Sequence, residues 1–84
     1  MATKTLKNTY KRKKFNAYII VKSRNGEKEQ YLKTTQCFVD DVYDAKFYKN
    51  LEEAQKDRNT ANFYDDLYML MLHQPKYNFE IIKV

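Results

Sequence analysis

The side chains best suited to metal binding or catalysis in this sequence are one cysteine, Cys37, and one histidine, His73. A structural zinc site usually needs four ligands, so these two would require an acid such as Asp40 or Asp44, or a second chain. The simpler interpretation is that Cys37 is a small buried side chain on a strand. His73 would then place a favourable charge near the end of a helix.

Acidic residues form two groups, Asp40 to Asp44 and the pair Asp65 and Asp66. The first group lacks the glycine and the regular ligand spacing of a calcium loop, so we expect solvated acids of a turn and of a helix surface. Cys37 and His73 could also act as a catalytic nucleophile and its general base. The sequence around them, however, contains no residues that would activate the thiol or form an oxyanion hole. The sequence therefore predicts no catalytic residues, no metal site, no cofactor and no enzyme activity.

The 84 residues are enough for one small domain with a modest core. With one glycine and one proline, the sequence contains no flexible linker and no glycine-rich phosphate loop. A single cysteine forms no internal disulfide, which favours a reducing compartment. No segment is apolar for long enough to be a secretory signal or a membrane span. These features predict a cytoplasmic protein without a membrane partner.

Basic charge is concentrated at the start of the chain. The first fourteen residues contain six lysines and arginines and no acid, whereas ten basic and eleven acidic residues follow. We expect residues 1–14 to be a flexible arm and residues 15–84 to be one domain. The arm is either a solvated tail or a site for nucleic acid or an acidic partner. In the second case its binding residues are Lys11, Arg12, Lys13, Lys14 and Tyr10, the tyrosine stacking on an unpaired base.

Residues 50–74 predict a long helix. Asn50 is a candidate N-cap, and Glu53 three residues later completes a capping box. Pro75 ends the helix, because the residue before a proline is pushed out of helical geometry. Asn59 is a weak helix former, so the helix could break there, although we favour one continuous helix. The residues that recur at helical spacing on one side are Ala54, Ala61, Tyr64, Tyr68, Met71 and Leu72.

Strands are expected before and after this helix. Residues 15–23 alternate in character, and Asn25-Gly26 favours a type I′ hairpin turn. That turn would place Ile20 opposite Tyr31 and Lys22 opposite Glu29. Further strands are expected at residues 31–38, 45–48 and 77–82. The fold class is α+β, a mostly antiparallel sheet of three to four strands in the order β-β-β-α-β with the helix across one face.

The later half of the helix is unusual because residues 67–72 are apolar or aromatic on every side. Strands and the chain ends could wrap both sides of it, or its second face could meet another chain, either a second copy or a target. Methionine-rich surfaces adapt to partners, and tyrosines are enriched at interfaces. The candidate interface residues are Tyr64, Tyr68, Leu67, Leu70 and Met71.

Residues 43–54, YDAKFYKNLEEA, resemble a pattern found in many small proteins of bacteriophages and mobile elements. In that pattern an A-x-x-F/Y strand precedes a capped helix that contains E-E-A. The resemblance implies an accessory protein of the host cytoplasm, and inhibitors of host defence, including anti-CRISPR proteins, are one such class. The class shares no motif, so no site residues are implied. Several of these inhibitors are strongly acidic mimics of DNA, which a neutral domain with a basic arm does not match.

We therefore expect a non-enzymatic binding protein that inhibits a host nucleic-acid-directed defence system by gripping a protein or protein–RNA surface with its helix. The alternative is a nucleic-acid-binding regulator that uses the basic arm. A homodimer joined through the later half of the helix is a third hypothesis.

Overall fold

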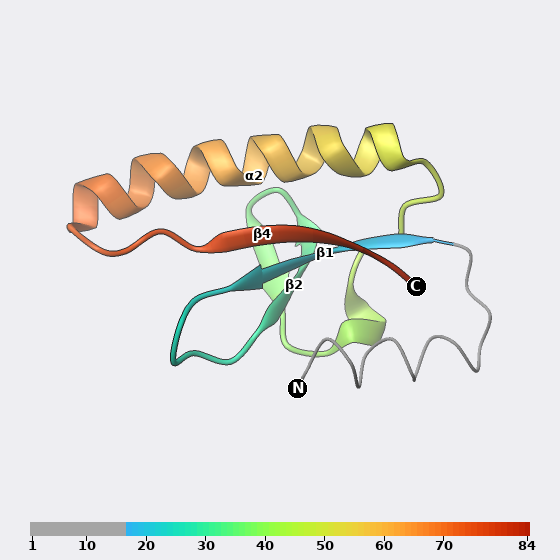
Figure 1. Cartoon of the computed structure of the whole chain (residues 1–84), viewed down its shortest axis with the longest axis horizontal. Coiled ribbons are helices and arrows are strands. Elements are labelled where there is room, and N and C mark those ends of the chain that lie inside the picture. Colours follow the sequence, from blue (N-terminus) through green and yellow to red (C-terminus); the bar gives the residue numbers. More distant parts are fainter. Residues whose placement is uncertain (1–16) are drawn as a thin grey trace.

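A computed structural model describes residues 17–84, which form a four-stranded antiparallel sheet with one long helix across one face (Figure 1). The spatial order of the strands is β3-β2-β1-β4. This confirms the α+β class and the order β-β-β-α-β, with a short 3-10 turn added before the helix. The predicted arm lies outside the described residues. The elements in chain order are β1 (Tyr18–Ser23), β2 (Gln30–Thr34), β3 (Cys37–Val39), η1 (Val42–Asp44), α2 (Leu51–Leu72) and β4 (Asn78–Lys83).

Strand β1 is central, and its side chains alternate between two apolar clusters, as predicted. Ile20 points toward the helix, whereas Ile19 and Val21 lie on the other face of the sheet. The cluster under the helix contains Ile20, Leu32, Tyr48, Ala54, Ala61 and Phe79. The cluster on the opposite face contains Ile19, Val21, Ala45 and Ile82.

The predicted hairpin register is wrong by one residue. Of the two central turn residues only Gly26 has a positive φ, 81°, whereas a type I′ turn requires both. The observed pairs are Val21 with Tyr31 and Lys22 with Gln30. This slip places Leu32 in the cluster under the helix and Tyr31 on the other face. A slip of one residue exchanges the two faces, so burial of leucine under the helix selects the observed register.

The third strand is also not where the sequence predicted it. A turn at Thr35 and Gln36 divides the expected second strand into β2 and β3, with a register shift beside it. The expected strand at residues 45–48 is instead a connection whose hydrogen bonds go to two different strands. Lys46 N–H donates to the Leu32 carbonyl at 2.9 Å, and Tyr48 forms an isolated bridge with Tyr18. A regular ladder needs successive bonds to one neighbour, so no strand forms there.

Helix α2 is continuous through Asn59, as we favoured. Asn50 caps its start, because the Asn50 side chain accepts a hydrogen bond from Glu52 N–H at 2.8 Å. Its end is a Schellman motif with His73 in the left-handed region at φ 55°. Gln74 N–H donates to the Met69 carbonyl, and His73 N–H to the Leu70 carbonyl. The helix therefore closes before Pro75 with the Met69 and Leu70 carbonyls hydrogen-bonded.

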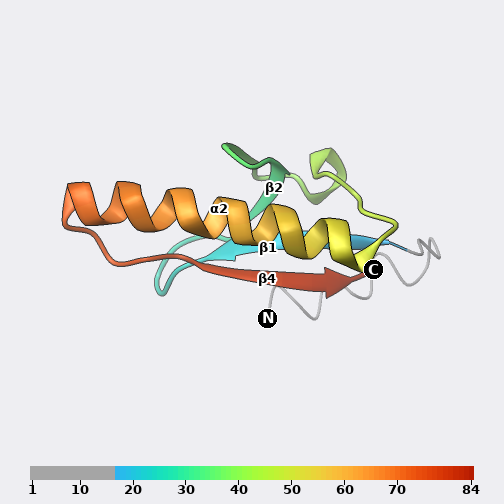
Figure 2. The same cartoon turned by 90° about the horizontal axis from the view of Figure 1, so that it is seen from above.

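The start of α2 is held to the sheet by Tyr48, whose ring is 2% exposed. Its hydroxyl donates to Oδ2 of Asp57 at 2.5 Å. From above, α2 runs along β1 and β4 while the β2–β3 hairpin stands to one side, and the last turns of the helix extend past the start of β4 (Figure 2). In residues 17–84 no helix combines the length and apolar character of a membrane span.

Candidate functional site

The last three turns of α2 present large apolar side chains to solvent. Leu70 and Met71 are each 74% exposed. We call the exposed set, all on the second half of the helix, the α2 apolar surface. Its members are Phe63, Leu67, Tyr68, Leu70, Met71 and Leu72.

The α2 apolar surface is exposed because the helix faces the sheet with other residues. Only Ala54, Ala61 and Asp65 are buried along its length. These three share one side at a period of 3.6, and the two alanines allow a close approach to the strands. Of the residues expected on one side of the helix, Ala54 and Ala61 are therefore buried, whereas Tyr68, Met71 and Leu72 are exposed. The helix contacts the sheet through small residues rather than large ones. Its last turns also extend beyond the end of the sheet (Figure 1).

Polar contacts hold this overhanging part of the helix in place. Asp65 is buried, and its Oδ2 accepts a hydrogen bond from Tyr77 N–H at 3.0 Å. Lys76 pairs with Asp66 at 2.5 Å. Arg24, at the end of β1, donates to the Pro75 carbonyl at 2.8 Å. The chain between α2 and β4 is thus tied both to the helix and to the first hairpin.

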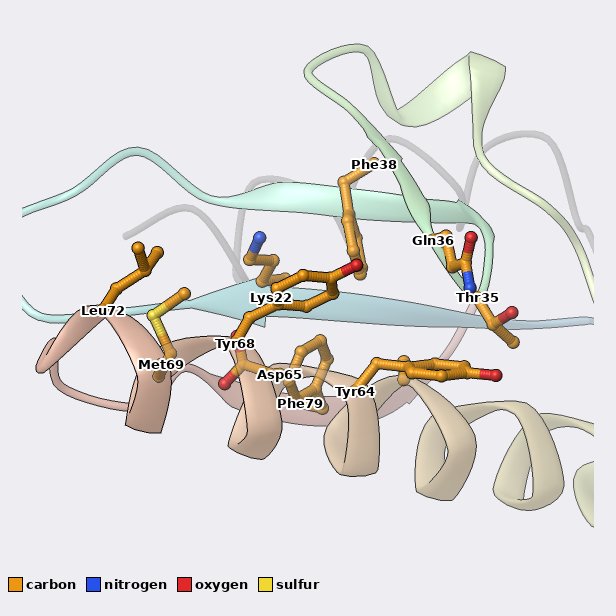
Figure 3. Close-up of a pocket in the computed structure, with 11 residues that line it drawn as sticks. Lys22, Thr35, Gln36, Phe38, Tyr64, Asp65, Tyr68, Met69, Leu72 and Phe79 are labelled. Atoms are coloured by element: carbon orange, nitrogen blue, oxygen red, sulfur yellow. The ribbon is translucent and has the colours of Figure 1, made fainter.

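A groove of about 380 Å³ lies between α2 and the β2–β3 hairpin, beside the α2 apolar surface (Figure 3). Tyr64 and Tyr68 approach it from the helix, and Phe38 approaches it from β3. Phe79 of β4 contributes to its floor, with its ring centroid 5.9 Å from that of Phe38. The groove therefore has aromatic walls supplied by three different elements.

Lys22 is the cation of this groove. Its Nζ lies 4.3 Å from the centroid of the Phe38 ring and 4.1 Å from that of Tyr77, so the ammonium is held over two aromatic faces. Partial burial lowers the pKa of Lys22, although the Asp65 carboxylate opposes that change. The predicted ion pair between Lys22 and Glu29 is not formed, because the hairpin adopts the other register.

Arg24 also contacts the Tyr77 ring, with its guanidinium carbon 4.1 Å from the centroid. Arg24 pairs with the carboxylate of Glu27, whereas Lys22 has no ion-pair partner among residues 17–84. Glu27 also accepts a hydrogen bond from the Tyr77 hydroxyl at 2.8 Å. That hydrogen bond is the main reason why the pKa of Glu27 is lowered and the pKa of Tyr77 is raised.

The predicted interface residues fall into two places. Leu67, Leu70 and Met71 lie on the α2 apolar surface, whereas Tyr64 is half-buried and lines the groove. Tyr68 belongs to both, because it is 57% exposed and also borders the groove. The predicted arm residues Tyr10, Lys11, Arg12, Lys13 and Lys14 lie outside the described residues.

Sequence reasoning missed Phe63, Phe38 and Lys22. The sequence does contain a signal for Phe63, since it precedes Leu67 by four residues and Leu70 by seven on one helical stripe. The other two depend on the hairpin register, which the turn sequence did not predict correctly.

Cys37 does not lie where the sequence predicted, whereas two of the acidic residues do occupy turns as expected. Cys37 is exposed on β3, so the prediction of its burial is wrong. Asp41 caps η1 by accepting from Tyr43 N–H at 2.9 Å, and Asp40 accepts from Gln30, as turn acids do. Within residues 17–84, no three histidine, cysteine or acidic side chains gather where they could share a metal ion.

Comparison of the chain with protein-family models, curated proteins and solved structures finds no match.

Proposed function

We propose that this chain is a non-enzymatic binding protein that docks on another protein through the α2 apolar surface. The observation that supports this best is the exposure of Leu70 and Met71 beside a groove with aromatic walls. Large contiguous apolar patches are uncommon on monomeric proteins unless they bind something. On this surface Phe63, Leu67 and Leu70 lie at i, i+4 and i+7, a spacing with which amphipathic helices place anchors in a groove.

The energetic argument rests on the two most exposed side chains. Complete burial of a leucine or methionine is worth about 1.5–3 kcal/mol each. Burial of Leu70 and Met71 together would therefore change a dissociation constant by roughly two orders of magnitude or more. Methionine adapts its shape to the partner, and Tyr68 adds a large contact area at low entropic cost.

We further propose, from the resemblance of residues 43–54 to phage and mobile-element proteins, that the partner belongs to a host nucleic-acid-directed defence system. On this proposal the protein is an inhibitor of the anti-CRISPR type, which grips a protein or protein–RNA surface. The near-neutral charge after residue 14 supports this mode over mimicry of DNA, because a mimic needs a dense negative surface.

The test is inhibition of purified CRISPR–Cas nuclease complexes of several types, measured as cleavage of a matched DNA target with increasing amounts of the protein. The variant with Leu70→Gln and Met71→Gln should lose inhibition while retaining the circular dichroism spectrum of the parent. Leu51→Gln is the matched control, since Leu51 is an exposed leucine at the other end of the same helix. Equal inhibition by all three proteins would contradict the proposed surface, and failure to inhibit any complex would contradict the proposed target.

One sequence feature favours a second function, nucleic-acid binding by the basic arm. The six uncompensated charges of residues 1–14 would release counterions from a phosphate backbone. Binding to RNA, single-stranded DNA or duplex DNA should then fall steeply as salt is raised and should be lost when residues 1–14 are removed. A flat salt response would dismiss this function.

A further inference from the structure

The groove beside the α2 apolar surface has the form of a receptor for one large side chain. Tyr64, Tyr68 and Phe38 provide opposing aromatic walls, and Leu72 closes the end nearest the helix terminus (Figure 3). A volume of about 380 Å³ is large enough for a phenylalanine or leucine side chain with its adjoining backbone. An apolar anchor from a bound protein would lose most of its water-exposed surface there.

Lys22 and Asp65 both line the groove but form no ion pair with each other in the described residues. Arg24 pairs with Glu27 and Lys76 pairs with Asp66. Lys22 has no carboxylate within ion-pair distance in residues 17–84, although it is partly buried over two rings. Asp65, which also lines the groove, uses Oδ2 to accept from Tyr77 N–H. The groove therefore offers a partly desolvated ammonium whose hydrogen-bonding capacity is left for a ligand.

We propose that the groove binds a segment of the partner protein in which a bulky apolar side chain is followed by a carboxylate, and that this carboxylate pairs with Lys22. The inference rests on the proposed function, because the segment belongs to the protein that docks on the α2 apolar surface. A carboxylate at this position compensates the Lys22 charge in a site with reduced access to water. The carboxylate contributes mainly to specificity, because a partner protein without a carboxylate would leave the Lys22 ammonium unpaired.

A peptide fits these observations better than a nucleic acid does. A single strand of nucleic acid needs several cations along its path, whereas Lys22 is the only lysine or arginine that lines the groove in the described part of the chain.

The inference is tested by NMR titration of the isotope-labelled full chain with two capped tripeptides, acetyl-Phe-Asp-Leu-amide and acetyl-Phe-Asn-Leu-amide. These probes have nearly the same shape and differ by one negative charge. The aspartate peptide should shift the backbone amides of Lys22, Phe38 and Tyr68 and saturate in the millimolar range. The asparagine peptide should bind about fivefold more weakly, the difference expected for one partly exposed ion pair.

Two lysine variants serve as matched tests. Lys22→Met keeps the apolar stem and removes the charge, so the two peptides should then bind equally. Lys33→Met removes an exposed lysine of β2 that does not line the groove, so the preference for aspartate should remain. The amide spectrum of each variant shows directly whether it is folded.

Several results would overturn the inference. These are equal affinities of the two peptides for the parent protein, an aspartate preference that survives Lys22→Met, shifts confined to residues outside the groove, or no saturable shift with either peptide. Groove shifts produced by raising protein concentration alone would assign the groove to a second copy, and stronger shifts with oligothymidylate would assign it to nucleic acid. Failure of the proposed function is distinguishable, because the peptide titration requires no defence complex. An aspartate preference in a protein that inhibits no complex would remove the proposed target and leave the groove assignment standing.

Discussion

The hydrogen bond between Tyr48 and Asp57 makes a specific prediction about stability. Replacing Tyr48 with phenylalanine removes a hydroxyl that donates to Asp57 Oδ2 at 2.5 Å and leaves the buried ring in place. A hydrogen bond to a charged group contributes about 1.5–3 kcal/mol. The Asp57 side chain is 27% exposed, so water replaces part of the lost bond. We therefore expect Tyr48→Phe to lower the free energy of unfolding by about 1.5 kcal/mol, which corresponds to a fall in Tm of roughly 6–12 °C.

The same substitution should show a characteristic dependence on pH. Burial and the bond to Asp57 raise the pKa of Tyr48 above its usual value of 10.0. A phenol with a higher pKa in the folded state favours folding at pH values below the unfolded pKa, and this contribution is lost as pH rises toward the folded pKa. The difference in stability between parent and variant should be constant up to about pH 9 and should shrink above about pH 10.

The assay is urea denaturation followed by circular dichroism, at a series of pH values on parent and variant. Tyr68→Phe is the control, because that ring is largely exposed and its substitution should change the free energy of unfolding by less than about 0.5 kcal/mol. A loss below about 0.5 kcal/mol for Tyr48→Phe would refute the assigned strength of the bond. A difference that stays constant to about pH 11 would refute its assignment to the phenol proton.

Three further predictions concern the ends of α2 and can be checked by the same denaturation. Asp65→Ala leaves the Tyr77 N–H without its acceptor and should cost about 1–3 kcal/mol, whereas Asp65→Asn retains an acceptor and should cost less; equal losses would contradict the role of that bond. His73→Gly removes a side chain from a position with φ 55° and should stabilise the protein by about 0.5–1 kcal/mol, and a decrease would show that the His73 side chain makes a favourable contact. Asn50→Ala removes the cap on Glu52 N–H and should cost about 1 kcal/mol, so an unchanged midpoint would dismiss the cap as a stabilising element.

The sequence correctly predicted those helices and strands whose position depends on neighbouring residues in the chain. The Asn50 cap and the stop before Pro75 bound a helix that the structure confirms, and alternation along β1 correctly predicted which of its side chains share a face. The hairpin register failed because the turn has one positive φ rather than two, and one residue more or less in a turn moves every later pair. That choice depends on burial of Leu32 under a helix distant in sequence.

The candidate site was predicted only in part, for a related reason. Composition indicated that residues 67–72 had apolar groups on every side, and Leu70 and Met71 are indeed exposed. The side expected from helical spacing is buried at Ala54 and Ala61, but its later members Tyr68, Met71 and Leu72 are exposed because the helix extends past the sheet. Lys22 escaped notice because its importance comes from rings on β3 and on the chain before β4. These rings come close to Lys22 only in the folded protein, so no single segment of the sequence indicates the contact.

Ala17 and Val84 exchange hydrogen bonds, with N–O distances of 3.3 and 2.8 Å, at the end of the sheet farthest from the α2 apolar surface. A tag or fluorescent protein fused after Val84 would therefore leave the candidate binding surface free for capture experiments. The same adjacency suits circular permutation of residues 17–84, in which a short linker replaces residues 1–16 and joins these two positions, and new ends are opened at the exposed Asn25-Gly26 turn. A permutant of this kind would keep the order of strands in the sheet while converting the pairing of β1 with β4 into a local hairpin.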